Sequence, residues 1–279
     1  MKDLLKFSWN PELKSPSLVV GWTVDASRLG TKVTDYLNSK IGGKKFCQVE
    51  PIEFFPLGGV TIEDDLLQFP ESSFYACPER DLLILKSTPP SHDWYRFLSL
   101  VLDVAAQYHV KEIHAVGAMV SLNAHTTPRD IMGTFNSAEF KNAMSVYHLN
   151  TEWDYETPLG QRPTLNSFLL WAANRRNLPG VSLWVPVPFY LVGVDDPQAE
   201  KKVLDFFNQR FNLQMDLSDL EEEAKSQNER IAAARQELPD IDKAIERLET
   251  NLRLSDEESQ ELAKEIESYL KEKRGLSPS

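Results

Sequence analysis

Short apolar runs and longer amphipathic stretches alternate along the first 213 residues of the chain. The short runs are rich in Leu, Val and Ile and are bounded by Gly or Pro, which is typical of strands in a sheet that is buried on both faces. The predicted strands lie at Leu18–Val20, Leu82–Leu85, Ile113–Val116 and Val181–Val187. The segment from Phe46 to Phe55 is also predicted to be extended, with an interruption at Pro51.

Apolar residues spaced three and four apart predict helices between these strands. The helices cover about Ala26–Leu37, Ser91–Tyr108 and Thr164–Asn174. A further helix begins after Asp196, a capping residue followed by Pro197 at the first helical position. This alternation favours an α/β fold with a mainly parallel sheet flanked by helices. We predict such a domain over residues 1–213, with ligands expected at the carboxyl ends of the strands.

Residues 214–279 follow a different pattern and predict an acidic helical tail, either a hairpin or kinked helices. Apolar positions three and four apart form a seam along one side of a helix. The seam includes Leu217, Leu220, Ile231, Leu238, Ile245, Leu248 and Leu252. Pro239 removes a backbone donor, so the helix must kink or fold back there. The helices either pack on the α/β body and on each other, or share a coiled-coil-like surface with another subunit or a partner. Because one helix cannot hide the seam alone, we predict a homo-oligomer.

Charge is concentrated in the same tail. The net charge of the chain is −12, and residues 214–279 hold 18 acidic against 10 basic residues, a net charge of −8. No basic face is evident, so nucleic acid is excluded as a partner, whereas a basic protein surface could complement the tail. The aromatic residues around Trp171, Trp184, Phe189 and Tyr190 have no interleaved basic residues, and we interpret them as core packing.

No targeting or membrane signal is evident. Met1–Pro11 mixes charged and polar residues with apolar ones, and no run approaches the roughly 20 apolar residues that span a bilayer. Cys47, Cys77 and the histidines have no metal-binding spacing. We therefore expect a cytoplasmic protein with no membrane association, no metal and no cofactor, in which both cysteines are buried free thiols.

Two loops carry candidate chemistry. Asp25 follows the first predicted strand at the entrance to a helix, where backbone donors favour an anion, although capping of that helix is the simpler interpretation. A loop after the strand at Ile113–Val116 contains His125, Thr127 and Arg129, which suit anion binding or acid–base chemistry. The structural alternative is a turn that its own side chains hold together. No phosphate-binding or nucleophile-elbow motif occurs, so we assign no catalytic residue.

Five short motifs follow one another along the chain. They are Gly21–Ala26, Asp81–Leu85 with Trp94–Phe97, Ala124–Pro128, Leu183–Tyr190, and Asp196–Ala199 with the acidic tail. Together they resemble the proteasome assembly chaperone 2 family from about Leu18 to Leu270. The resemblance implies a fold similar to nucleoside phosphorylases, oligomer formation and, from eukaryotic members, a role in proteasome assembly. Prokaryotic members include proteins without an assigned function and proteins labelled as ATP-grasp-like. The resemblance also adds Tyr190 to the candidate binding residues.

The chain departs from the family pattern where chemistry would be expected. Thr127 and Phe189 stand where the pattern has Arg and His, and Ser87-Thr88-Pro89 lacks its Glu. Acid–base catalysis requires a titratable group, so these departures favour a protein without enzymatic activity. The chain ends in Gly275–Ser279, whereas some archaeal members dock on the proteasome through a hydrophobic–Tyr–any ending. We therefore do not expect direct proteasome activation.

The sequence thus favours a non-enzymatic oligomeric scaffold or assembly-chaperone-like protein, for which proteasome-related proteins are candidate partners. The alternative is a small-molecule-binding protein or enzyme that uses the loops around Asp25, His125 and Arg129. A third hypothesis is a purely structural oligomer without a separate client. A closed polar pocket would favour the second hypothesis, and exposed apolar surface would favour the first.

Overall fold

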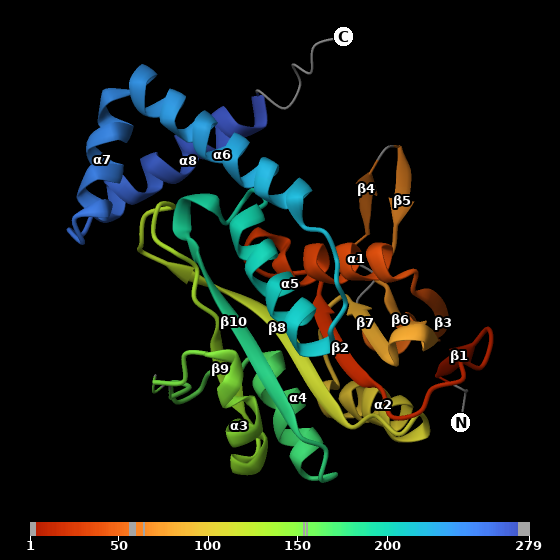
Figure 1. Ribbon diagram of the computed structural model, residues 1–279. Helices are drawn as coiled ribbons and strands as arrows, with labels where there is room; N and C mark the ends of the chain where they lie inside the picture. Colours follow the sequence, from red (N-terminus) through yellow and green to blue (C-terminus); the bar gives the residue numbers. More distant parts are fainter. Residues whose placement is uncertain (1–3, 56–59, 64, 153, 155, 273–279) are drawn as a thin grey trace.

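The centre of the fold is an eight-stranded sheet in the order β1-β3-β6-β7-β2-β8-β10-β9 (Figure 1). The structure is a computed structural model that describes residues 4–55, 60–63, 65–152, 154 and 156–272. The inner strands are parallel to one another: β7 (Leu82–Ser87), β2 (Ser17–Trp22), β8 (Glu112–Ser121) and β10 (Gly180–Pro188). The outer strands pair antiparallel: β1 (Leu5–Phe7), β3 (Lys44–Val49), β6 (Ser72–Cys77) and β9 (Met132–Phe135). The predicted parallel centre is confirmed, and the antiparallel margins add to it.

Helices cover both faces of the sheet, which explains the continuous apolar runs of its inner strands. On β2, Val19 points into the core cluster that includes α1 and α5, and Leu18 and Val20 point into the cluster that includes α2 and α4. The helices are α1 (Leu29–Ile41), α2 (Trp94–Gln107), α3 (Ala138–Met144), α4 (Leu165–Asn174) and α5 (Pro197–Phe211). The 3₁₀ turns are η1 (Ala26–Arg28), η2 (Pro51–Glu53), η3 (Pro78–Arg80), η4 (Ser145–Tyr147) and η5 (Phe189–Leu191). The predicted α/β fold with helices on both faces is therefore confirmed.

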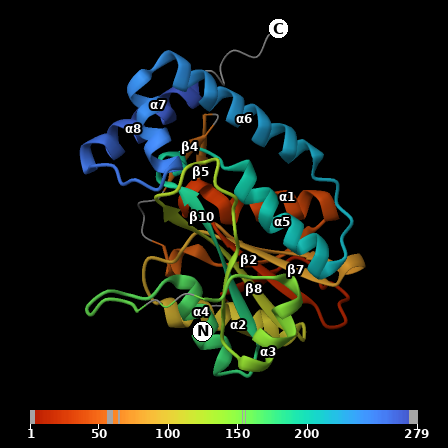
Figure 2. The ribbon, with the colours of Figure 1, turned by 60° about the vertical axis from the view of Figure 1, so that its left-hand side comes forward.

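Three C-terminal helices lie beyond the carboxyl ends of β8 and β10 (Figures 1 and 2). They are α6 (Ser218–Glu237), α7 (Pro239–Glu249) and α8 (Asp256–Glu272). Pro239 begins α7, so the break lies where the sequence predicts it. Helix α8 packs on η5, and a Cβ at Gly193 would lie only 2.7 Å from the Glu267 carboxyl group. Glycine at this position therefore permits the close approach of α8.

The apolar seam of these helices is covered by the chain itself. Most of its side chains are buried in the core cluster that includes α1 and α5: Leu217, Leu220, Ile231, Ile245 and Leu248. Leu238 is partly buried against the same cluster, whereas Leu252 is 56% exposed. In the single chain the helices fold onto one another and onto the body, which is the first of the two alternatives, and Leu252 is the seam residue that stays most exposed. Self-association stays a prediction and needs another surface.

Several expectations from composition can be compared with the described residues. Within them, no helix has both the length and the apolarity needed to cross a membrane, and no three His, Cys, Asp or Glu side chains gather as a metal site. Cys47 and Cys77 are both buried, as predicted. The C-terminal sequence Gly275–Ser279 lies outside the described residues.

A small second sheet stands apart from the large one. Its strands β4 (Thr61–Glu63) and β5 (Leu66–Gln68) pair antiparallel in a hairpin between η2 and β6. Figure 1 shows this hairpin projecting from the side of the molecule that carries β3 and β6. The sequence patterns used above did not predict it.

Candidate functional site

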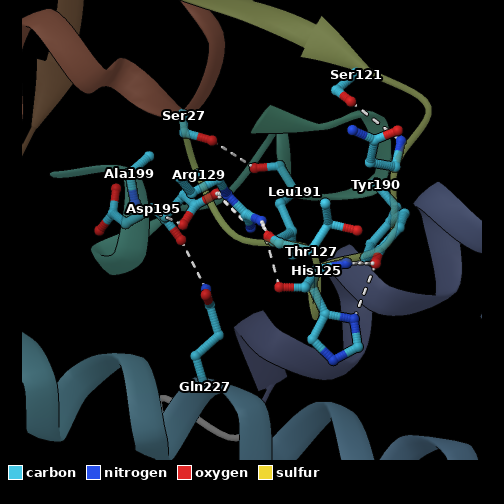
Figure 3. A network of polar contacts seen from close by, with 12 residues as sticks. Ser27, Ser121, His125, Thr127, Arg129, Tyr190, Leu191, Asp195, Ala199 and Gln227 are labelled. Atoms are coloured by element: carbon cyan, nitrogen blue, oxygen red, sulfur yellow. Dashed lines mark hydrogen bonds and ion pairs between the residues drawn. The ribbon is translucent and has the colours of Figure 1, made fainter. Parts of the chain in front are cut away.

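Three chain segments meet at the carboxyl edge of the parallel strands (Figure 3). Asp25 follows β2, the loop with His125 and Arg129 follows β8, and Tyr190 lies in η5 directly after β10. Parallel strands end at one edge of the sheet, which brings these distant segments together. The structure joins His125, Arg129 and Tyr190 in one hydrogen-bonded arrangement, called the edge network below, together with Asp195 and Asp196.

His125 and Tyr190 form the inner part of the edge network. The backbone N–H of His125 donates to the Tyr190 hydroxyl at 2.6 Å, and that oxygen lies 2.9 Å from Nδ1 of the His125 ring. Because the hydroxyl oxygen accepts the backbone N–H, its own proton is available to Nδ1, which fits the neutral Nε2–H tautomer of the ring. Burial lowers the pKa of His125 to about 4, and Glu249 offsets only part of this effect. The ring is therefore neutral near pH 7, and burial also raises the pKa of Tyr190.

Arg129 fastens the loop to the start of helix α5. Its Nε and Nη2 donate to Oδ2 of Asp196 at 3.1 and 3.0 Å. Its Nη1 donates to the carbonyl oxygens of Thr127 at 2.7 Å and His125 at 3.3 Å. Both side chains of the ion pair are almost fully buried, and Oδ1 of Asp196 accepts the N–H of Ala199 as the predicted helix cap. The guanidinium thus holds backbone and helix end together.

Asp195 forms a second ion-pair cluster beside the first. Its carboxylate lies 2.8 Å from Nη2 of Arg28 and 2.9 Å from Nζ of Lys32. Burial opposes ionisation, but the hydrogen bonds from Lys32 and Arg28 outweigh it and lower the pKa of Asp195. The backbone carbonyl of Asp195 accepts a hydrogen bond of 2.7 Å from Gln227 of α6. The cluster therefore connects α1, the start of α5 and the first C-terminal helix.

Asp25 lies at the same edge but outside this network. Its Oδ2 accepts the N–H of Gly30 at 2.9 Å in the first turn of α1, although the residue at the N-cap position of α1 is Arg28. Its Oδ1 is buried without a hydrogen-bond partner among the described residues. Burial raises the pKa of Asp25 to about 7, although nearby backbone N–H groups favour the carboxylate. No hydrogen bond between described residues joins Asp25 to His125 or Arg129, so the two candidate loops do not form one catalytic centre.

The C-terminal helices restrict access to the edge network. The Thr126 hydroxyl donates to Glu249 of α7 at 3.2 Å. Gln227 of α6 makes the second contact, its hydrogen bond to the carbonyl of Asp195. An open groove of about 660 Å³ runs beside the network between α5 and α6, and its lining includes Arg129 and Lys201. Lys201 is already paired with Asp205 and Glu221 in this groove. Because the polar groups mostly satisfy one another, the arrangement suits structural fastening better than acid–base chemistry.

The sequence points to His125, Arg129 and Tyr190 in this arrangement, but not to their ion-pair partners. Asp196 was predicted only as a helix cap, and the Asp195 cluster was not predicted. Asp196 is 67 residues from Arg129, and no local pattern joins positions so far apart. Thr127 accepts the hydrogen bond from Arg129 through its backbone carbonyl. This contact does not depend on the side chain, so it is kept although Thr127 stands where the family motif has Arg.

A cluster of aromatic and arginine side chains lies elsewhere, on α2, α4 and the segment before α4. This aromatic–arginine patch consists of Trp94, Tyr95, Arg162, Phe168, Trp171 and Arg175. Phe168 stacks on Trp171 with ring centroids 5.2 Å apart, and Tyr95 meets Trp171 edge-on at 6.1 Å. The guanidinium of Arg175 lies 5.3 Å from the Trp171 ring centroid. Tyr95 is 57% and Trp171 47% exposed, so the patch faces solvent.

The core-packing interpretation of the aromatic residues is therefore wrong for Trp171. Helix α4 buries Leu165, Leu169 and Ala172 toward the sheet, and Trp171 lies on its outer side. The interpretation is right for Tyr190, which is fully buried.

Comparison with known proteins places the chain in a family. The model of the PAC2 family matches residues 18–235. The chain belongs to the PAC2 family. This confirms the resemblance found in the five motifs. The uncharacterised protein MJ1210 of Methanocaldococcus jannaschii is 24% identical over 212 residues, which cover 71% of this chain and 74% of the relative.

Solved structures share the PAC2 fold at low sequence identity. A Corynebacterium glutamicum protein of unknown function is 16% identical with a TM-score of 0.75, covering 89% of this chain and 96% of its own. The Pyrococcus furiosus protein PbaB, an archaeal proteasome activator, is 18% identical with a TM-score of 0.68, covering 83% and 98%. The Mycobacterium tuberculosis proteasome-assembly chaperone homologue Rv2125 is 19% identical with a TM-score of 0.67, covering 78% and 94%. These likenesses establish the fold.

Proposed function

We propose that this PAC2 protein is a non-enzymatic scaffold or assembly chaperone that binds protein partners through the aromatic–arginine patch. The observation that carries the proposal is the exposure of Tyr95 and Trp171 beside Arg162 and Arg175. Tyr, Trp and Arg are the residue types most enriched among the side chains that dominate protein–protein binding. A half-exposed Trp that stacks on a neighbouring ring offers contact area at little entropic cost.

The charge of the patch indicates the chemistry of the partner. Arg162 and Arg175 stack on Trp rings, and neither forms an ion pair with another described residue, whereas the neighbouring Arg176 pairs with Asp103. Stacked guanidinium groups keep donors free for carboxylates. We therefore expect a protein segment with acidic and aromatic side chains. Because one structural relative is a proteasome activator and another a proteasome-assembly chaperone homologue, proteasome-related proteins are the first candidates.

The edge network supports the same proposal because, among the described residues, it lacks an acid or base that can reach a substrate. Its buried ion pair is internally satisfied, its histidine is neutral, and the groove beside it is open. A catalytic acid or base needs a titratable group that can reach a substrate.

A location in the cytoplasm and a homo-oligomeric state stay predictions.

Small-molecule binding at Asp25 is the second candidate function. It is favoured by the buried Oδ1 without a partner and by the pKa of about 7, since perturbed carboxyl groups occur often at functional sites. The groove beside the edge network is not lined by Asp25, so this candidate has weaker support.

A capture experiment tests the proposed function. Immobilised wild-type protein and the variant Trp171→Ala with Arg175→Ala are exposed to host proteasome α-type subunits and to host extract. Loss of two central contacts should weaken binding of the captured protein by at least about tenfold. The control, Val146→Ala with Arg176→Ala, also removes one exposed apolar side chain and one arginine, and it should bind like the wild type. Equal capture by the patch variant, or no specific capture by the wild type, would reject the proposal.

A further inference from the structure

The β4–β5 hairpin carries an apolar face that no described part of the chain covers. Ile62 and Leu67 are paired directly across the hairpin, and Val60 and Phe69 lie two positions away on the same side of the pleat. Ile62 is 71%, Leu67 60% and Phe69 66% exposed, and Val60 is exposed as well. The hairpin stands clear of the large sheet (Figure 1). Four neighbouring apolar side chains on one face therefore meet solvent in the single chain.

This arrangement is unusual for a hairpin that is complete by itself. A two-stranded hairpin is marginal in water unless a third strand or another layer covers its apolar face. Each of its strands also has only one neighbour among the described strands, which leaves two edges with unpaired backbone groups. Contiguous exposed apolar surface with free strand edges is typical of an interaction site.

The same side of the molecule offers a matching apolar surface. Strand β1 is the outermost strand there, and Phe7 and Trp9 remain exposed at its end. Figure 1 places β1 and the hairpin on this side, away from the C-terminal helices α7 and α8. One chain thus carries both a projecting apolar arm and, farther along the same side of the molecule, the exposed Phe7 and Trp9. Two copies related by a two-fold axis can satisfy both at once.

We infer that the β4–β5 hairpin is an exchange arm, whose apolar face packs on a second copy of this chain at the surface around Phe7 and Trp9. The area of the arm favours this occupant. The exposed parts of the four apolar side chains of the arm amount to roughly 500 Å². One arm on one receiving surface would therefore bury about 1,000 Å² in total, less than the roughly 1,600 Å² that is typical of a stable interface. A two-fold exchange uses two arms and two receiving surfaces, so the total reaches about 2,000 Å².

This inference deepens the proposed oligomeric scaffold by assigning its self-association to a surface other than the C-terminal seam. It is independent of the aromatic–arginine patch, which lies on α2 and α4. The arm variants leave the patch unchanged, and the patch variant leaves the arm unchanged. Failure of one idea is therefore distinguishable from failure of the other.

The test is the molar mass of the full chain in solution, measured by light scattering at about 20 µM. The wild type should contain an even number of copies, and Ile62→Asp with Leu67→Asp should halve the mass while circular dichroism and the melting profile still show a folded protein. The control, Val146→Asp with Leu159→Asp, introduces two charges at exposed apolar positions outside the arm and should keep the wild-type mass.

A milder pair, Ile62→Ser with Leu67→Ser, serves if the charged variant does not fold and should also halve the mass. The patch variant Trp171→Ala with Arg175→Ala should keep the wild-type mass even if it loses its partner. A monomeric wild type, an odd number of copies, or an arm variant with unchanged mass would overturn the inference.

Discussion

The edge network and the aromatic–arginine patch use similar residue types in opposite ways. In the edge network, Arg129 is buried against Asp196 and binds backbone carbonyls, and Tyr190 is fully buried with its hydroxyl on His125. In the patch, Arg175 lies on the half-exposed ring of Trp171, and neither it nor Arg162 has a carboxylate partner among the described residues. The first arrangement consumes its hydrogen-bonding capacity within the fold, whereas the second keeps it available to another molecule.

The partners of a polar group thus separate structural groups from recognition surfaces. A buried arginine with a full set of partners contributes mainly to stability, and its loss strands a charge in the interior. An exposed arginine on an aromatic ring contributes little to stability and can contribute much to binding. The two regions should therefore respond in opposite ways to equivalent substitutions.

Arg129→Met should have the largest effect on stability. It leaves the buried carboxylate of Asp196 without its partner, which costs about 3–5 kcal/mol. The matched substitution Arg175→Met in the patch should change the free energy of unfolding by less than about 0.5 kcal/mol. Urea unfolding of both variants measures the contrast. Similar costs at the two positions would break the distinction between the regions.

Asp25→Asn tests the isolated carboxyl group at the same edge. The folded-state pKa of about 7 lies above the unfolded value near 3.8, so the wild type is fully stabilised below pH 4 and loses stability as pH rises through 7. The asparagine does not titrate. The stability of the variant relative to the wild type should therefore improve by about 4 kcal/mol between pH 4 and pH 8. Thermal unfolding across this range measures the change, and a pH-independent difference would contradict the raised pKa.

Tyr190→Phe should cost about 1–3 kcal/mol, because the buried N–H of His125 loses its acceptor and the imidazole loses a donor. The matched change Tyr95→Phe removes an exposed hydroxyl and should stay within about 0.5 kcal/mol. Equal melting temperatures for Tyr190→Phe and the wild type would indicate that the hydroxyl is not part of a buried network.

Trp171→Ala should have only a small effect on stability, below about 1 kcal/mol, since nearly half of the side chain is exposed. Its effect on partner binding should be larger than that of any other single substitution in the patch. A loss of stability greater than about 2 kcal/mol would return Trp171 to the core, as the sequence interpretation had it.

The sequence predicts the centre of the fold well, because the apolar runs in β2 (Leu18–Val20) and β7 (Leu82–Leu85) are continuous and short. It predicts the margins poorly. Strand β1 has only three residues, and β6 is polar at Ser72 and Ser73, so neither has a clear apolar signal. The hairpin alternates apolar and other residues, but its strands are so short that the pattern is weak.

The candidate site shows the same division between local and distant information. His125 and Arg129 share a loop, and the family motif points to Tyr190, so these three are accessible from the sequence. The pairing of Arg129 with Asp196 depends on the order of strands in the sheet, which periodicity does not give. The exposure of Trp171 depends on which side of α4 meets the sheet, and that helix is apolar on more than one side.

The carboxyl edge around the edge network is, in our interpretation, a fastened structural region and not a small-molecule site. The most direct test is a thermal-shift screen of the wild type against phosphates, nucleotides and carboxylates, repeated with His125→Ala and Arg129→Ala combined. We expect none of these compounds to raise the melting temperature of the wild type by more than about 1 °C, while the double variant melts several degrees lower without ligand. A rise of several degrees with any one compound, lost in the double variant, would contradict it.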